Sequence, residues 1–222
     1  MTIVELKEVY RTYKMGKVEV PAIRGIDLKI KKGEFIAIMG PSGSGKSTLM
    51  HMVGCLDIPD DGEIYLEDDN IAKLHESDLA QIRGKKIGFI FQQFNLINSL
   101  NALENVALAM SFQGVKEKER TSRAKELLDI VGLKDRISHL PTELSGGEQQ
   151  RVAIARSLAN NPDIILVDEP TGNLDSVTGK KVMEFFTKLN KDGKTIILIT
   201  HDKDVAKYAK RIVKLRDGRI EK

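Results

Sequence analysis

The residues best suited to chemistry lie at positions 40–47, in the order G-P-S-G-S-G-K-S. This order matches G-x-x-x-x-G-K-[ST], in which glycines let the backbone turn tightly and point its N–H groups at phosphate oxygens. Lys46 adds an ammonium for the β- and γ-phosphates, and the Ser47 hydroxyl is a candidate ligand of Mg²⁺. The stretch therefore predicts a nucleotide phosphate site. Its predicted contact residues are Gly40, Pro41, Ser42, Gly43, Ser44, Gly45, Lys46, Ser47 and Thr48.

A pair of carboxylates, Asp168 and Glu169, follows the apolar stretch at positions 164–167. Two acidic side chains at the end of a buried strand are unfavourable unless a cation or a reaction uses them. Asp168 is predicted to support Mg²⁺ through its water shell, and Glu169 to polarise an attacking water. The alternative is a capping or surface role for the pair, which the phosphate loop disfavours.

Single polar residues follow two other apolar stretches. Gln92 follows positions 87–91, and His201 follows positions 195–200. Parallel strands present ligand groups at their carboxyl ends, so Gln92 is a candidate sensor of Mg²⁺ or of the attacking water. His201 is a candidate partner of a γ-phosphate, where it holds the water and Glu169 in line. Position alone leaves open that Gln92 has no such role and that His201 is an ordinary loop histidine.

A second possible anion site begins at Ser145. A serine and two glycines precede a helical run at positions 152–158, which is typical of an N-capped helix with an open backbone. A Ser-Gly-Gly triplet is weak evidence by itself, but this one belongs to a longer stretch, 144–151, that precedes the acidic strand. The nucleotide-contacting residues predicted here are Ser145, Gly146, Gly147 and Glu148.

The elements that must position these residues alternate between strands and helices. Apolar stretches at positions 35–39, 87–91, 164–167 and 195–200 predict buried strands. Apolar residues spaced by three and four predict an amphipathic helix at positions 176–191. Such an alternation predicts an α/β fold with a parallel sheet.

Two regions depart from this alternation. Positions 3–9 and 26–30 alternate apolar and polar side chains, which predicts antiparallel strands with one face in water. From Asn101 to about Leu133 the pattern is helical instead. We therefore expect an inserted helical subdomain in that part of the chain.

Composition bears on three questions: nucleic-acid binding, disulfide bonds and membrane insertion. The 222 residues include 35 Lys+Arg and 32 Asp+Glu, and a net charge of +3 is too weak to indicate a nucleic-acid partner. The single cysteine, Cys55, cannot form an internal disulfide, and we expect it to pack in the core, on the helix after the phosphate loop. Neither a basic-then-apolar leader nor a membrane-spanning apolar run is evident, so a cytoplasmic protein is expected.

Taken together, these motifs resemble the nucleotide-binding domain of an ATP-binding cassette (ABC) transporter over nearly the whole chain. Positions 40–47 match the Walker A motif of that family and positions 164–168 its Walker B motif. Positions 144–148 match its signature motif, which many other P-loop ATPases lack. One departure is Glu148, where the commonest signature has glutamine; the variant is familiar in close relatives.

The resemblance implies a role for each matching residue. Lys46, Gln92, Glu169 and His201 are implied to be catalytic. ATP contacts are implied also for Asp175, in the D-loop, and for Tyr13, which matches the aromatic residue that stacks on adenine. The residues alone favour an ordinary strand surface for this tyrosine. The implied Mg²⁺ ligands are Ser47, Gln92 and Asp168.

The resemblance also implies an architecture and a mode of action. We expect an α/β P-loop NTPase (RecA-like) core with an N-terminal antiparallel β-subdomain and an inserted α-helical subdomain. The single domain would span 1–222, with the nucleotide-binding core at 1–93 and 160–222 and the helical signature subdomain at about 94–159. Two copies are expected to form a head-to-tail dimer that sandwiches ATP, binds Mg²⁺, and powers a membrane permease.

The branch of the family is narrowed by two stretches. Positions 88–96 and 168–175 resemble the members that serve lipoprotein release, macrolide or peptide export, and cell division. In such members the permease lies near the residues that match Phe94, Asn95 and Leu96, which places the protein at the inner face of the membrane. An exporter-like ATPase is the favoured hypothesis. The alternative is a regulatory ATPase of a division-type complex, which transports nothing.

Overall fold

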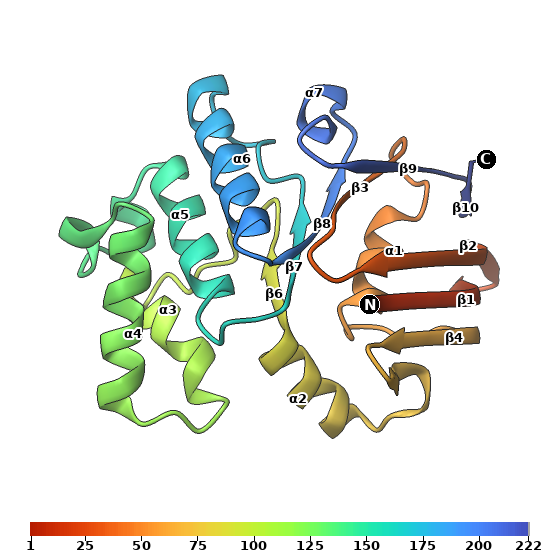
Figure 1. Cartoon of the computed structure of the whole chain (residues 1–222), viewed down its shortest axis with the longest axis horizontal. Helices are drawn as coiled ribbons and strands as arrows, with labels where there is room; N and C mark the ends of the chain where they lie inside the picture. Colours follow the sequence, from red (N-terminus) through yellow and green to blue (C-terminus); the bar gives the residue numbers. More distant parts are fainter. Residues whose placement is uncertain (222) are drawn as a thin grey trace.

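Residues 1–221 are described by a computed structural model, and Lys222, the last residue of the predicted domain, lies outside it. A six-stranded sheet forms the middle of the molecule (Figure 1), in the order β10-β9-β3-β8-β7-β6. Its pairs are parallel except for β9 with β10. The strands are β3 (Phe35–Met39), β6 (Ile87–Ile90), β7 (Ile164–Asp168), β8 (Thr195–Thr200), β9 (Arg211–Arg216) and β10 (Arg219–Ile220).

A second, antiparallel sheet lies at one end of the molecule, on the right in Figure 1. Its order is β2-β1-β4-β5. The strands are β1 (Thr2–Met15), β2 (Val18–Lys31), β4 (Asp61–Leu66) and β5 (Asp69–Asn70). The antiparallel pairing predicted for the first two strands is confirmed, and both strands extend well beyond the alternating stretches that indicated them.

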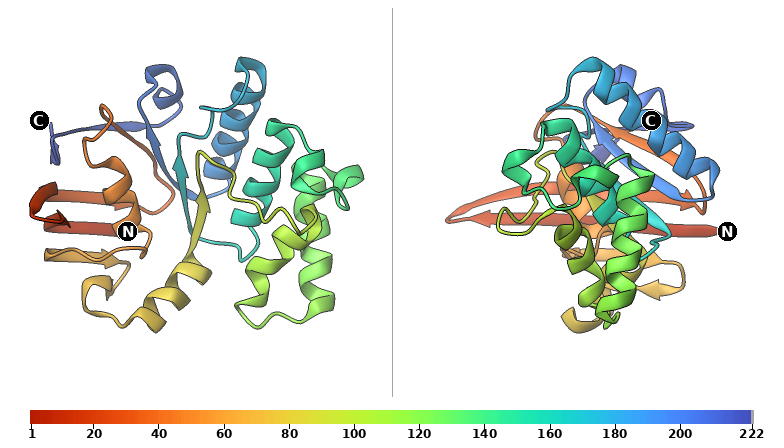
Figure 2. Two further views of the ribbon diagram at one scale, coloured as in Figure 1. Left: turned by 180° about the vertical axis from the view of Figure 1, so that it is seen from behind. Right: turned by 90° about the vertical axis from the view of Figure 1, so that its left-hand side faces the viewer.

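Four of the helices show how the two ends of the molecule are built. α1 contacts β2 and β4 of one sheet and β8 of the other, so it lies between the two sheets. α3, α4 and α5 contact one another and form a separate group at the far end from the antiparallel sheet (Figures 1 and 2). The helices are α1 (Lys46–Val53), α2 (Glu76–Lys86), α3 (Ala102–Ser111), α4 (Glu117–Ile130), α5 (Gly146–Ser157), α6 (Ser176–Lys191) and α7 (Lys203–Ala206).

Both faces of the parallel sheet are buried, and alternate residues of each strand face different cores. Ile36 and Ile38 of β3 belong to the hydrophobic cluster shared with α1 and the antiparallel sheet. Phe35 and Ala37 belong to the cluster that includes residues of α3–α6. Strand side chains alternate between faces, and a strand covered on both sides is apolar throughout. This explains the uninterrupted apolar stretches in the sequence.

The helical region expected from Asn101 to about Leu133 consists of two helices, α3 and α4, with Gly114 at a positive φ of 72° in the turn between them. One prediction about a helix needs correction. Cys55 is buried as expected, but it lies beyond the end of α1 in a left-handed conformation, with φ of 55°. Within residues 1–221 we find no helix with the length and apolar character that a membrane crossing requires.

Candidate nucleotide site

The phosphate loop connects β3 to α1, as the motif requires. Gly45 is the N-cap of α1 and has φ of 100°, a conformation that favours glycine. A Cβ at this position would lie 2.5 Å from the carbonyl oxygen of Ala22, so a larger residue would also clash. No side chain of the described residues caps the helix, which leaves the N–H groups of its first turn directed into the loop. The local structure is therefore an anion-binding helix N-terminus.

Lys46 is held inside the loop. Its Nζ donates to the carbonyl oxygens of Gly40, at 2.8 Å, and of Pro41, at 2.7 Å. Burial lowers the pKa of this ammonium, and the negative charges of Glu169 and Asp168 act in the opposite direction. The fold thus brings the lysine of the loop within electrostatic reach of both Asp168, which ends β7, and Glu169, which follows it.

Asp168 occupies the last position of β7. Burial raises the pKa of its carboxyl, the charge of Glu169 raises it further, and His51 and Lys46 counteract the rise. His51 lies on α1, close enough for its charge to lower the pKa of this carboxyl. Among residues 1–221 there is no cluster of three or more His, Cys, Asp or Glu side chains that could hold a metal alone. A Mg²⁺ ion here would depend on phosphate oxygens and water, which it commonly retains.

Glu169 is the most firmly positioned acid of the site. Its Oε1 accepts from the backbone N–H of His201 at 2.9 Å and lies 2.6 Å from His201 Nδ1, the donor of that contact. Its Oε2 accepts from the hydroxyl of Thr200 at 3.1 Å. Thr200 was missed by sequence reasoning, because nothing in a strand-end threonine indicates a carboxylate 31 residues away.

Gln92 lies just past β6, exposed, near the segment that follows the acidic pair. Its backbone oxygen accepts from the Asn173 side chain at 2.9 Å, and its Nε2 lies beside Gly172. Gln92 and Glu169 each follow one of two parallel neighbouring strands, β6 and β7. They therefore lie at the same edge of the sheet, where the strands end. Its role toward Mg²⁺ or water stays a prediction.

Tyr13 lies on β1, away from the parallel sheet. Its hydroxyl donates to Oδ2 of Asp57 at 2.7 Å, and burial, followed by this hydrogen bond, raises its pKa. Asp57 comes shortly after α1, the helix that begins at the phosphate loop. The tyrosine is thus tied to the element that carries the predicted phosphate contacts.

Ser145 caps α5 in the manner the sequence predicted. Its Oγ accepts from the N–H of Glu148 at 3.3 Å, while the Glu148 carboxylate accepts from the N–H and hydroxyl of Ser145, both at 2.8 Å. These hydrogen bonds, those to the backbone first, lower the pKa of Glu148. The glutamate that departs from the commonest signature motif therefore completes a capping box.

The structure does not bring residues 145–148 to the phosphate loop of the same chain. α5 lies at one end of the molecule, and α1 lies on the other side of the parallel sheet (Figures 1 and 2). Asp175 is likewise engaged locally, since its carboxylate caps α6 by accepting from the N–H groups of Val177 and Thr178, both at 3.0 Å. The nucleotide contacts predicted for these residues stay predictions.

Comparison with protein families matches residues 23–172 to the ABC transporter family. The chain belongs to that family. An ABC transporter ATP-binding protein of Thermotoga maritima is 52% identical over 219 residues, covering 99% of this chain and 94% of its own length. The macrolide export ATP-binding/permease protein MacB of Wolinella succinogenes is 50% identical over 218 residues, but these are only 34% of that protein.

The fold agrees closely with solved structures. Two structures of MJ0796, an ATP-binding cassette of Methanocaldococcus jannaschii, each superpose with a TM-score of 0.92 and 51% identity, covering 99% of this chain and 97% of theirs. Both are described as dimeric, and one as a post-hydrolysis state bound to ADP and Pi. The predicted family, the P-loop NTPase fold and the identity of the chain as an ATP-binding, ATP-hydrolysing subunit are confirmed.

Proposed function

We propose that this ATPase works as a head-to-tail pair that sandwiches ATP and drives a membrane permease. The observation that carries the proposal is the separation of two anion-binding helix N-termini, those of α1 and α5, by the parallel sheet (Figure 1). One copy cannot apply both to one triphosphate. A two-fold axis that places α5 of one copy over the phosphate loop of the other completes two equivalent sites. The dimeric descriptions of MJ0796 support this arrangement.

In such a site, this chain supplies charge, hydrogen-bond donors and a base. Lys46 and the loop amides stabilise the charge that spreads over the γ-phosphoryl oxygens. Glu169 accepts a proton from the attacking water or orients it, while His201 positions the Glu169 carboxylate and contacts the γ-phosphate. The Ser47 hydroxyl, the Asp168 carboxylate and the Gln92 amide are the oxygen donors that suit Mg²⁺, which when bound neutralises phosphate charge.

The proposal of an ATP-dependent dimer is tested with Glu169→Gln. Gln cannot accept a proton, so the variant is expected to bind ATP, fail to hydrolyse it and elute from gel filtration as a dimer only when ATP is present. Glu184→Gln is a matched control, because Glu184 is an exposed residue of α6. A Glu169→Gln protein that stays monomeric at every ATP concentration contradicts the sandwich dimer.

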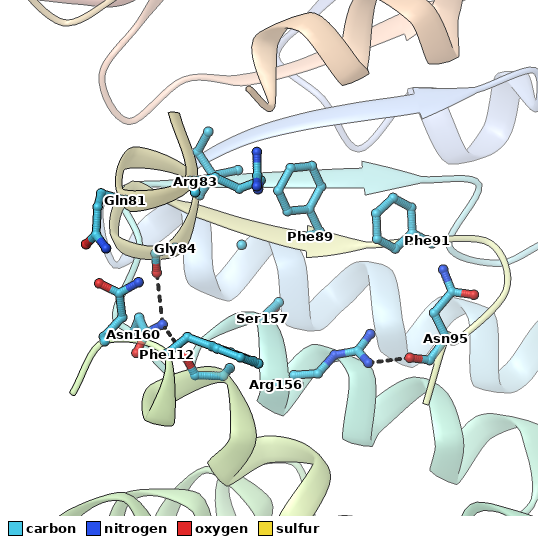
Figure 3. Close-up of a pocket in the computed structure, with 15 residues that line it drawn as sticks. Gln81, Arg83, Gly84, Phe89, Phe91, Asn95, Phe112, Arg156, Ser157 and Asn160 are labelled. Atoms are coloured by element: carbon cyan, nitrogen blue, oxygen red, sulfur yellow. Dashed lines mark hydrogen bonds between the residues drawn. The ribbon is translucent and has the colours of Figure 1, made fainter. Parts of the chain in front are cut away.

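The permease is proposed to dock in a groove of about 680 Å³ between β6 and the helical group (Figure 3). Phe89 and Phe91 line it with stacked rings whose centroids are 5.5 Å apart. Phe112, which is 74% exposed, contributes a third aromatic side chain. Among the residues that the structure describes, the lining includes Arg83 and Arg156 but no carboxylate. An apolar element with an acidic or carbonyl-rich end is therefore the complementary partner.

Arg156 connects this groove to the segment after Gln92. Its guanidinium donates to the backbone oxygen of Phe94 at 2.9 Å and to that of Asn95 at 2.5 Å, the second of which is drawn in Figure 3. Of the three residues predicted at the permease contact, Asn95 lines the groove, whereas Leu96 packs against the core. A partner in the groove thus reaches both α5 and the residues next to Gln92, the route by which docking and hydrolysis are proposed to be coupled.

Docking is tested with Phe112→Asp by co-purification with an ABC permease subunit that is expressed together with this protein. The variant is expected to keep the ATP-dependent dimer and to lose co-purification with the permease. Ile130→Asp is the control, since Ile130 is 53% exposed on α4 and does not line the groove. Equal loss in both variants, or in neither, argues against this docking site.

The MacB names support an exporter-like partner over the division-type alternative. Docking to such a permease would place the protein at the cytoplasmic face of the membrane.

A further inference from the structure

Arg11 and Tyr13 lie two residues apart on β1, so their side chains share one face of the strand. The central carbon of the Arg11 guanidinium lies 5.0 Å from the centroid of the Tyr13 ring. This distance is within the range of cation–π attraction. One face of the tyrosine ring is therefore covered by a cation from the same strand.

Two aspartates hold the guanidinium in this place. Arg11 Nε and Nη2 donate to Oδ2 and Oδ1 of Asp57 at 3.1 and 2.7 Å, and Nη1 donates to Oδ1 of Asp60 at 2.6 Å. The Arg11 and Asp57 side chains are only 21% and 18% exposed. Two parallel hydrogen bonds to one carboxylate fix the plane of a guanidinium as well as its position. Because Tyr13 donates to the same Asp57, the ring and the cation share one anchor.

The anchor is attached to the phosphate loop through α1. The N–H groups of Leu56 and Asp57 both donate to the carbonyl oxygen of His51, in the last turn of α1, at 2.8 and 3.3 Å. The same helix begins at Lys46, inside the loop. The distance between the tyrosine ring and the phosphate-binding amides is thus set by a short, rigid segment.

We propose that Arg11 is a positioning residue for the nucleotide base. Held by Asp57 and Asp60, it covers one face of Tyr13 and leaves the opposite face as a fixed platform on which adenine stacks. This inference rests on the proposed function and on the predicted contact of Tyr13 with the base. A ring that is already immobilised loses less conformational freedom on binding, so the contact is stronger than that of a free tyrosine. Since every base has an aromatic face, the platform raises affinity more than selectivity.

The test compares two ligands by calorimetry, Mg–ATP and Mg–tripolyphosphate, which lacks the base. Arg11→Ala is expected to weaken ATP binding about three- to tenfold, the scale of a partly desolvated cation–π contact. It should leave tripolyphosphate binding and kcat at saturating ATP unchanged while raising KM. Arg11→Lys, which keeps the cation but not the fork, should fall between wild type and Arg11→Ala.

Lys7→Ala is the matched control. Lys7 lies on the same strand, and its Nζ is 4.7 Å from the centroid of the Tyr65 ring, so a comparable pair is removed outside the site. This variant should bind ATP as wild type does. Asp60→Asn, which loosens Arg11 without removing it, provides a second variant in case Arg11→Ala folds poorly, and a smaller loss of ATP affinity is expected.

The outcomes separate this inference from the proposed function. Equal weakening of both ligands in Arg11→Ala, or unchanged ATP affinity, overturns the positioning role. A wild-type protein that hydrolyses ATP but binds it no more tightly than tripolyphosphate overturns the base platform and leaves the dimer mechanism standing. A Glu169→Gln protein that stays monomeric in ATP contradicts the proposed function, whereas a loss of affinity confined to ATP in Arg11→Ala still supports the role of Arg11.

Discussion

Replacing Thr200 by valine is expected to lower kcat about tenfold and to leave KM for ATP within about twofold. The hydroxyl of Thr200 accepts from the N–H of Asp202 at 3.0 Å, so its proton is free to donate to Oε2 of Glu169. Thr200 is 1% exposed, and no water replaces this donor easily. The substitution therefore releases one oxygen of the catalytic carboxylate while His201 retains the other.

The magnitude follows from the kind of bond that is lost. A hydrogen bond to a charged acceptor contributes about 1.5–3 kcal/mol. Two of the three donors to Glu169 remain, so only the lower part of that range should appear in the activation barrier. A change of about 1.4 kcal/mol corresponds to a tenfold lower rate. Phosphate release measured against ATP concentration gives kcat and KM separately, and Thr200→Ser, which keeps the hydroxyl, should behave like wild type.

A second threonine of the same strand provides the control for stability. Thr195 begins β8, is fully buried, and accepts from the N–H of Gly33 at 3.0 Å, outside the site. Thr195→Val should lower the melting temperature by an amount similar to Thr200→Val without changing kcat. If Thr200→Val has wild-type kcat, or if Thr195→Val loses as much activity, the hydroxyl does not orient Glu169 and the reasoning is refuted.

Three further predictions concern other parts of the chain. Cys55, whose pKa is raised to about 11 by burial, should resist alkylation at pH 8 until the protein unfolds, as mass spectrometry can follow. Asp168→Asn should abolish hydrolysis but raise the melting temperature at pH 7, because burial raises the pKa of Asp168 and so disfavours its charged form in the fold. That gain should shrink as the pH falls through the raised pKa and vanish below 3.8, the ordinary value. Ser145→Ala and Asn101→Ala each remove a capping box, so each should lower the free energy of unfolding, measured in urea, by about 1 kcal/mol. Only Ser145→Ala should also abolish hydrolysis.

The sequence predicted the helices and strands that are determined by residues close together in the chain. The helix at positions 176–191 and the strand at positions 195–200 have the bounds that their patterns indicated, because periodicity and capping act within a few residues. The parallel sheet followed from uninterrupted apolar strands. The ends of β1 and β2 were missed, since their outer parts pair with each other as an exposed hairpin that apolar alternation does not mark.

The hydrogen bonds that hold the side chains of the site in place could not be predicted from the sequence. Arg11 and Asp57 are 46 residues apart, and Arg156 and Phe94 are 62 residues apart. Each pair meets only because distant elements pack against each other, and neither residue type has a local pattern that indicates its partner. Motif spacing predicted which residues contact the ligand. It gave no information on the residues that hold those side chains in place.

The signature glycines illustrate why the choice of variant matters for testing the dimer. A Cβ at Gly147 would lie 2.8 Å from Cγ2 of Thr178 on α6, so this glycine is required for packing within one copy. Loss of activity in Gly147→Ala would therefore follow from a displaced α5 whether or not a second copy binds there. Within residues 1–221, the Ser145 hydroxyl forms hydrogen bonds only inside its own helix cap. The capping box at Asn101 is therefore a control for the loss of such a cap. A difference in activity between those two substitutions can come only from what the exposed end of α5 contacts, which is the evidence that the dimer mechanism needs.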